Sequence, residues 1–313
     1  MNFVIPAGSS ANLPKEVVDK IVANAVESSI LVKIINNRQQ MIEIVNEGTI
    51  PVIGAEDLTK IYRLDGTDDI TSLTEQSMAI KTPDLAPIEI GHYLRLKTKQ
   101  LAQYPELSLD RLFENRLARG LSRAIDKLVT VGDTEAVGAT NLLSICNGLY
   151  TVAASGSLCA NTAIEYAASQ SDDILDATSD GIESLAAYGD EDQMNDLFIF
   201  GSSDFVSACR KAANKDYVGF SIEPVAELGL QKVVHLHGIP VLKRSNISGE
   251  KAVLANMKGA FVGYYGVIGV DVEHQAGRRS DLMVITYWVD YKWAFLNDSS
   301  KAEGMVMIRK ASS

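Results

Sequence analysis

The residues of this sequence whose types and spacing could do chemistry are few, and His235 and His237 come first. If the HLHG segment is a strand, both imidazoles point to the same side, as two metal ligands would. However, no third His, Cys or carboxylate follows at a metal-like spacing. The pair therefore favours edge-strand or surface histidines over a metal site.

Other residues of metal-binding type also have simpler explanations. Glu273-His274 and His92 do not belong to a helical HExxH pattern, which sets two histidines one turn apart. The acidic residues at 172–173 and 190–192 are typical of a capped helix start and of a solvated loop. We therefore predict no metal-binding residue.

Motifs for phosphate binding and for nucleophilic catalysis are missing as well. The segment from Gly132 to Gly138 has neither the GxGxxG spacing nor the lysine of a phosphate-binding loop. No GxSxG occurs, and no Ser-His-Asp or Cys-His set can be assigned. We predict no catalytic residue, no cofactor-binding residue and no cofactor. Active sites are assembled from residues far apart in the sequence, so an enzyme stays among the alternatives.

The composition excludes one further class of function. The 313 residues are 46% hydrophobic and 22% charged, which is typical of a globular protein of about two domains. The 40 acidic residues outnumber the 29 basic ones and give a net charge of −11. A nucleic-acid-binding surface needs concentrated positive charge, and here the basic residues are scattered.

The cysteines and the apolar runs indicate the compartment. Cys146, Cys159 and Cys209 have no CxxC spacing, which fits buried thiols in a reducing environment. No apolar run reaches the 18 or so residues that cross a bilayer. The N-terminus lacks the basic segment and apolar block of a secretory signal. We expect synthesis in the cytoplasm.

The strongest structural signal is a long amphipathic helix, predicted from Ser108 to Val131. Its apolar residues recur at steps of three and four, which places them on one face. These residues are Leu109, Leu112, Phe113, Leu117, Leu121, Ile125, Leu128 and Val129. Ser108 is expected to cap the helix, and Gly132 to end it in the left-handed conformation. Such a helix would extend about 36 Å and act as a spine. Gly120, in its middle, either admits another backbone or is tolerated at about 1 kcal/mol.

The first 90 residues are predicted to contain two extended segments. Residues 1–14 form an arm, bound to a neighbouring subunit or frayed, and a short helix follows over 15–28. From Ile30 the β-branched residues predict strands up to residue 53. The polar section from Gly54 to Ile90 is uncommon inside a compact domain and predicts a projecting two-stranded excursion. Because an isolated hairpin is only marginally stable, we expect it to lie on another subunit.

The remaining chain alternates strands and helices. Residues 216–229 are predicted to be a connection. A strand at Asn195–Phe200 followed by a helix capped by Ser202 favours a layer of helix on sheet. Further elements are predicted as a strand in YLRLKTKQLA, a helix over Ser171–Tyr188, the strands GIPVLKRS and KAVLANM, and a strand-rich end from Gly266 to Arg309.

This order of parts resembles one protein family. Three pieces carry the resemblance: strand, spine and Gly-Asp over Tyr93–Asp133, strand and alanine-rich helix over Asn195–Asn214, and the GIPV strand with its polar turn and next strand over Gly238–Asn256. With the arm and the excursion, they resemble a major capsid protein of tailed bacteriophages, the Hong Kong 97-type fold. The resemblance covers nearly the whole chain and rests on order, spacing and character of the segments.

The resemblance implies an α+β fold with four kinds of part. Residues 1–28 would be the N-terminal arm and short helix, 54–90 the extended loop, and 160–262 the axial domain near the capsomer centre. The peripheral domain would comprise strands at 29–53, the spine helix within 91–159, and the C-terminal strands at 263–313.

The implied function is structural and not enzymatic. A major capsid protein self-assembles into hexamers and pentamers of an icosahedral shell that encloses phage double-stranded DNA. The implied partners are copies of the chain, a separate scaffolding protein, a portal and optional decoration proteins, with no sequence-specific DNA contact and no membrane. The implied location is the virion, after synthesis in the host bacterial cytoplasm.

Two features of some family members are not expected here. Because the chain reaches the arm directly after Met1, we expect no cleaved N-terminal scaffolding segment. Some members form a Lys–Asn isopeptide, for which Lys60 or Lys81 could supply the amine and Asn297 the amide. No catalytic Glu can be assigned to that reaction, so we expect no crosslink.

Three alternatives stay open. An encapsulin-type nanocompartment shares the fold but encloses enzyme cargo. A cytoplasmic acidic α/β enzyme would need a deep pocket with converging polar groups. A binding or adhesion module would use the long loop to contact a foreign ligand.

Overall fold

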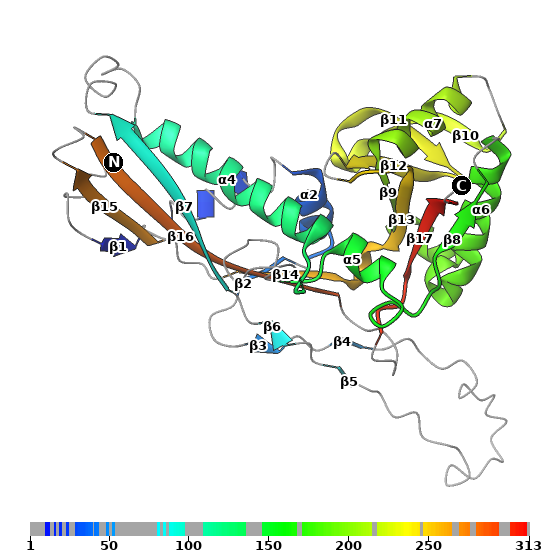
Figure 1. Cartoon of the computed structure of the whole chain (residues 1–313), viewed down its shortest axis with the longest axis horizontal. Coiled ribbons are helices and arrows are strands. Elements are labelled where there is room, and N and C mark those ends of the chain that lie inside the picture. Colours follow the sequence, from blue (N-terminus) through cyan, green and yellow to red (C-terminus); the bar gives the residue numbers. More distant parts are fainter. Residues whose placement is uncertain are drawn as a thin grey trace, which may run out of the picture.

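The computed structural model describes the chain in segments. These are residues 10–12, 29–39, 41–43, 48–49, 52–53, 80–81, 84–85, 88–97, 109–135, 146–167, 171–214, 218–244, 247–264, 269–275, 280–293 and 301–311, with single helical positions at 16, 19, 20, 23 and 24. The molecule is elongated: a long helix and long strands lead from one end to a compact body at the other (Figure 1).

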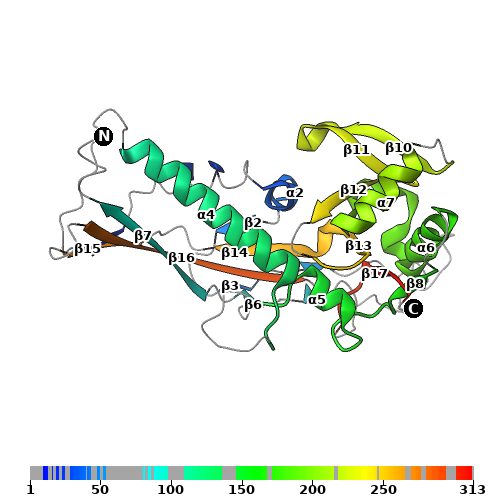
Figure 2. The same cartoon turned by 45° about the horizontal axis from the view of Figure 1, so that its top comes forward.

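The extended part of the molecule, opposite the compact body, is built on a six-stranded sheet. Three of its strands pair with β16, Ser280–Trp293. It pairs antiparallel with β7 (Ile88–Lys97), β15 (Gly269–Gln275) and β14 (Ala260–Tyr264). The sheet is completed by β1 (Ser10–Asn12) on β15 and β2 (Met41–Glu43) on β14. Figure 2 shows α4, Leu109–Val131, lying along this sheet.

The compact body is built on a seven-stranded mixed sheet with the order β10-β11-β12-β9-β13-β17-β8. Its strands are β8 (Ile164–Tyr166), β9 (Leu197–Ser202), β10 (Phe220–Val225), β11 (Leu230–Leu236), β12 (Ile239–Arg244), β13 (Lys251–Asn256) and β17 (Met305–Lys310). Its central strand, β9, is buried along its whole length, as expected for a strand covered on both faces.

Alternate residues of β9 belong to two different cores. Leu197 and Ile199 pack in a cluster with side chains of α6 (Ser171–Ser184) and α7 (Ser203–Ala213). Phe198 and Phe200 pack in a second cluster with α2 (Ile30–Asn37), α4 and α5 (Leu149–Ala154). Because successive side chains of a strand point to opposite faces, the sheet is sandwiched between these two helical layers.

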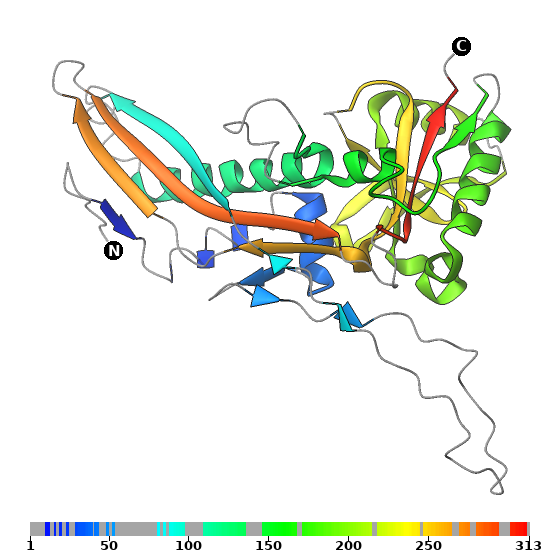
Figure 3. The same cartoon turned by 60° about the horizontal axis from the view of Figure 1, so that its bottom comes forward.

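Two short antiparallel ladders lie on the other side of β14 and β16 from α4 (Figure 3). One joins β3 (Gly48–Thr49) to β6 (Asp84–Leu85), and the other joins β4 (Val52–Ile53) to β5 (Ile80–Lys81). They bring together the two ends of the predicted excursion. Residues 54–79 lie outside the described residues.

The prediction of a strand from Ile30 is wrong, because these residues form α2. The Ser29 hydroxyl accepts a hydrogen bond from the Val32 N–H at 3.3 Å, which caps the helix. Leu31, Val32, Ile34 and Ile35 are all buried. Their local preference for strand is outweighed because the helix buries this face against α4 and β14.

Two further elements differ from the sequence prediction. The predicted connection 216–229 contains β10. Among the described strands it lies at the edge of the sheet and pairs with β11, and its buried and exposed residues do not alternate. The short helix α5 lies in a segment predicted to be rich in turns, and six residues are too few to show a helical period.

The predicted long helix is confirmed over Leu109–Val131, its role as a spine stays a prediction, and Gly132 does not end it in the left-handed conformation. A Cβ at Gly132 would lie 2.3 Å from the Cys146 carbonyl oxygen, and one at Gly148 would lie 2.6 Å from the Gly132 nitrogen. Gly132 is therefore needed for close backbone approach. At Gly120 a Cβ would meet no atom of the described residues within 4 Å, so the described part of the chain shows no close backbone approach that requires this glycine. Ser108 lies outside the described residues.

The arm and the C-terminal strands are only partly visible. Within the arm, Ser10–Asn12 pairs with β15 of the same chain, and the described helical positions between 16 and 24 have exposed side chains. β17, from the segment assigned to the peripheral domain, pairs instead with β13 and β8 of the seven-stranded sheet. The domain boundaries themselves stay a prediction.

Candidate functional site

Only the first of the two histidines lies in a strand. β11 ends at Leu236, so His237 lies in the following turn, with φ of 50°. His235 is buried, and its Nδ1 lies 3.1 Å from the Val233 carbonyl oxygen. The exposed His237 places Nε2 3.1 Å from the Leu175 carbonyl oxygen. Each ring lies at hydrogen-bond distance from a backbone carbonyl oxygen, and the condition for a common side, that both histidines lie in a strand, is not met.

The other candidates do not converge. His92 lies in β7 opposite Ile285, whereas Glu273 and His274 lie in β15 opposite Leu282 and Asp281. Over the described segments, no group of three or more His, Cys, Asp or Glu side chains could hold a metal ion. For the crosslink considered above, the structure describes only the backbone of Lys81, and Lys60 and Asn297 lie outside the described residues.

The cysteines behave as buried thiols. Cys146, Cys159 and Cys209 are free and buried, as the sequence predicted. Burial raises the pKa of the Cys209 thiol to about 12 and also raises that of Cys159. Because the thiolate is the nucleophile, a raised pKa makes a cysteine unreactive at neutral pH.

What the fold does bring together is a junction between the spine, α2 and the seven-stranded sheet. One continuous core joins Ile125 and Leu128 of α4 to Ile34 of α2 and to Phe200 of β9. These side chains are at most 1% exposed. The two ends of the molecule therefore share close-packed apolar side chains, which resist relative displacement.

Asp126 is the polar centre at one end of α2. Its Oδ1 accepts a hydrogen bond from Ser29 Oγ at 2.8 Å and one from Arg244 Nη1 at 2.6 Å. The carboxylate also lies at the N-terminus of α2, where the helix dipole favours negative charge. Asp126 thereby ties α4 to residues 97 and 118 positions away in the sequence.

Arg244 is held by more than this ion pair. It is 8% exposed, and its guanidinium lies over the ring of Phe200 at 5.4 Å. The Tyr150 hydroxyl donates to the carbonyl oxygen of Phe200, and burial raises the pKa of Tyr150 although the charge of Arg244 lowers it. A buried cation beside one carboxylate makes the junction sensitive to loss of Asp126.

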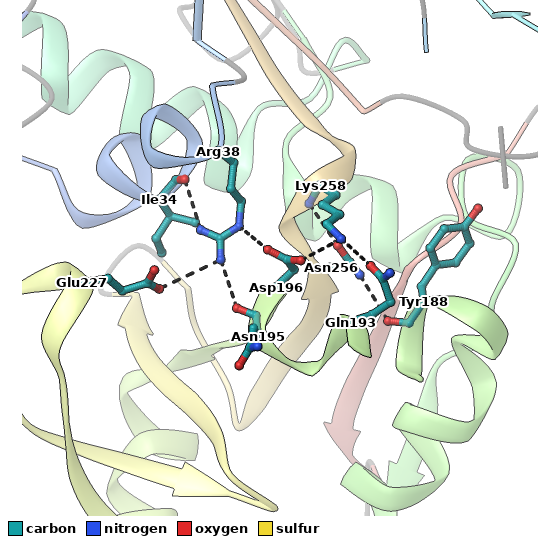
Figure 4. A network of polar contacts seen from close by, with 9 residues as sticks. All are labelled: Ile34, Arg38, Tyr188, Gln193, Asn195, Asp196, Glu227, Asn256 and Lys258. Carbon is teal, nitrogen blue, oxygen red and sulfur yellow. Dashed lines mark hydrogen bonds and ion pairs between the residues drawn. The ribbon is translucent and has the colours of Figure 1, made fainter. Parts of the chain in front are cut away.

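Arg38 fixes the other end of α2, as Figure 4 shows. Its Nε donates to Asp196 Oδ1 at 2.9 Å, and its Nη2 donates to the Asn195 carbonyl oxygen at 3.1 Å. Nη1 donates to the Ile34 carbonyl oxygen at 3.3 Å, which satisfies a carbonyl in the last turn of α2. The guanidinium also lies 5.0 Å from the ring centre of Phe198.

The same network extends to the turn after β13. Lys258 Nζ lies 3.0 Å from Asp196 Oδ2 and 2.8 Å from Gln193 Oε1. Asn256 caps this turn through the Lys258 N–H and donates to the Tyr188 carbonyl oxygen at 3.2 Å. Asp196 therefore bridges two cations from elements on either side of β9 in the sequence.

These contacts join elements that are far apart in the sequence. Their shared effect is to hold α2, which follows the arm and precedes the strands leading into the excursion. Sequence reasoning missed Asp126, Arg38 and Arg244. Their partners lie far away in the chain. The only sequence signal for a buried contact was a charged residue within an apolar segment.

Comparison with known proteins comes from structure alone. No protein-family model and no curated protein sequence matches the chain. A subunit of the satellite phage P4 procapsid, solved with its size determination protein, superposes with a TM-score of 0.61 and 12% identity over 93% of this chain and 98% of that one. A protein of Microbacterium phage Oxtober96 superposes with a TM-score of 0.54 and 14% identity over 99% of this chain and 94% of that one.

A third neighbour is the capsid protein of an empty GTA particle, with a TM-score of 0.55 and 14% identity over 91% of this chain and 90% of that one. These three likenesses show that the chain has the fold of phage capsid proteins, an α+β fold with mixed sheets.

In the described part of the chain, no helix is long and apolar enough to cross a membrane.

Proposed function

We propose that this chain, which has the fold of phage capsid proteins, is a major capsid protein. It self-assembles into hexamers and pentamers of an icosahedral shell that encloses phage double-stranded DNA. The observation that carries the proposal is the agreement with capsid subunits over nearly the full length of both chains, 93% and 98% for the P4 procapsid. The role is structural rather than catalytic.

The shape and the junction support this role. A shell subunit must transmit load between its neighbours without bending, and here one buried core runs from α4 into the seven-stranded sheet. The polar contacts of Asp126 and Arg38 fix α2 at both ends of that core. The subunit is therefore suited to act as a rigid unit of the shell.

The N-terminal arm and the extended loop are proposed to join one subunit to the next. Residues 1–28 would form the arm and 54–90 the extended loop, both reaching neighbouring subunits. The two ladders at the base of the excursion support this for the loop, because each has strands of only two residues, whereas the described strand of the arm, β1, pairs with β15 of its own chain. Elements this small are not stable alone and gain stability by burial on a partner.

The proposed domain division follows the resemblance. The axial domain comprises 160–262 without β14 and with β17 added to its sheet, and the peripheral domain comprises 29–53, 91–159, β14 and the rest of 263–313. The proposed partners are copies of the chain, a separate scaffolding protein, a portal and optional decoration proteins. The proposed location is the virion.

Negative-stain microscopy of the purified chain tests the proposal. We expect rings, sheets or closed shells, and nuclease-protected DNA in shells recovered from infected cells. Small discrete particles under all assembly conditions would contradict the function, and shells filled with protein cargo would favour a nanocompartment.

A matched deletion separates folding from assembly. Replacing residues 55–78 by a short Gly-Ser linker leaves both ladders in place. We expect an unchanged far-ultraviolet circular dichroism spectrum per ordered residue and no shells. A deletion variant that still forms shells would show that the excursion does not join subunits.

A further inference from the structure

The exposed face of α4 carries a line of positive charge. Arg119, Arg123 and Lys127 are exposed at steps of four residues, which places them on one side of the helix. Successive charges are about 6 Å apart along the axis. Within the described part of the chain, no hydrogen bond or ion pair joins these three side chains to another residue.

The exposed face of α6 carries a line of negative charge of similar length. Asp176, Asp180 and Glu183 are exposed at steps of four and three residues, about 6 and 4.5 Å along the axis. α6 packs on β8 and β17. The cations of β17 do not neutralise this line, because Arg309 pairs with Glu165 at 2.6 Å and Lys310 with Glu250 at 3.3 Å.

The two lines cannot meet within one molecule. α4 packs in the cluster that contains Phe198, whereas α6 packs in the cluster that contains Ile199, on the opposite face of the seven-stranded sheet. Figure 1 shows α6 at the outer edge of the compact body, away from α4. Each copy therefore presents a positive and a negative line on separate surfaces.

We propose that the cation line of α4 in one copy docks against the acidic line of α6 in a second copy. The inference rests on the proposed shell function and names the surfaces that meet in it. Such a contact joins two different patches, so it is heterologous and builds rings when the rotation closes. That is the symmetry a capsomer needs.

A second copy fits the cation line better than a nucleic acid does. The chain carries a net charge of −11, so the rest of its surface repels a polyanion. By contrast, the acidic line has a similar length and carries the same number of charges, and every neighbouring subunit supplies it. Charges arranged in this way set partner orientation and association rate more than affinity.

Charge reversal tests the proposal. One variant carries Arg119→Glu, Arg123→Glu and Lys127→Glu, and a second carries Asp176→Lys, Asp180→Lys and Glu183→Lys. Each should raise the protein concentration needed for half-maximal assembly about tenfold or more, because three attractive pairs become repulsive. The chain with all six substitutions should assemble within about threefold of wild type, since the polarity is swapped on both sides.

The control reverses two exposed cations outside the line, Arg210→Glu and Lys211→Glu on α7. It should assemble like wild type. Circular dichroism and the thermal midpoint verify folding, and glutamine at the three α4 positions supplies a neutral variant that should assemble at intermediate concentration.

The inference is overturned if either reversed variant assembles like wild type or if the six-substitution chain gives no rescue. Normal shells with reduced DNA content from the α4 variant would assign the line to nucleic acid and also overturn it. Failure of the wild-type chain to form any shell would instead refute the proposed function.

Discussion

Replacing Asp126 by asparagine tests how strongly the junction depends on its buried ion pair. Asp126 and Arg244 approach to 2.6 Å, with side chains 27% and 10% exposed. Exposed pairs are worth about 0–1 kcal/mol, whereas loss of one partner of a buried pair costs about 3–5 kcal/mol. Because Asp126 is partly exposed and asparagine still accepts a hydrogen bond, we expect a loss of about 2 kcal/mol in unfolding free energy.

The chain supplies a matched control with the same separation and different burial. Arg309 and Glu165 also approach to 2.6 Å, but their side chains are 48% and 46% exposed. Glu165→Gln should therefore change the unfolding free energy by less than about 1 kcal/mol. Urea unfolding of the unassembled subunit, followed by far-ultraviolet circular dichroism, measures both variants. Equal losses in the two would refute the reasoning that burial decides the strength of the pair.

A double substitution separates the charge from the packing. Asp126→Leu combined with Arg244→Met replaces both partners by apolar side chains, a change that is often neutral when the volume is kept. We expect the double variant to be more stable than either single variant. If the two single losses simply add, the side chains act independently and the ion pair is not the reason for the loss.

The remaining predictions concern backbone contact, capping and pH. Gly132→Ala should destabilise the subunit by more than about 2 kcal/mol because its Cβ would overlap the backbone, whereas Gly120→Ala should stabilise it by about 0.5–1 kcal/mol; a reversed order in urea unfolding would contradict this. Ser202→Ala should lose about 1 kcal/mol through the cap of α7; an unchanged thermal midpoint would argue against the cap. Burial and the charge of Glu303 raise the pKa of Tyr188 to about 12. The neutral hydroxyl therefore contributes fully to the unfolding free energy below pH 10, and this contribution is lost as the pH rises from about 10 to 12. Tyrosinate absorbance can follow the titration, and Tyr188→Phe should reduce the loss of stability over this pH range.

Local sequence patterns were sufficient to predict a helix or strand where the apolar residues of that segment alone mark it. The spine needs only apolar residues at steps of three and four, and β9 needs only a short apolar run before a capping serine. The pattern failed at α2, where β-branched residues favoured a strand. It also failed at β10, where an edge position removes the alternation.

The candidate site was beyond the reach of pattern reading for a different reason. Asp126 and Arg38 look like ordinary surface charges in the sequence, because nothing near them in the chain marks a partner. Their partners are 118 and 158 residues away. Contacts at such separations are chosen by how the sheet and helices pack, so neither charge could be assigned in advance.

The sequence by itself determined the long helix, the strand and capped helix of β9 and α7, the acidic balance and the absence of any recognisable catalytic motif. These follow from short-range periodicity and composition, which each segment carries alone. Only the tertiary structure decided that 30–37 is a helix, that β17 joins the seven-stranded sheet, and that α4 and α6 lie on opposite faces of it. Each of these depends on which surfaces bury one another, and burial is a property of the whole packed chain.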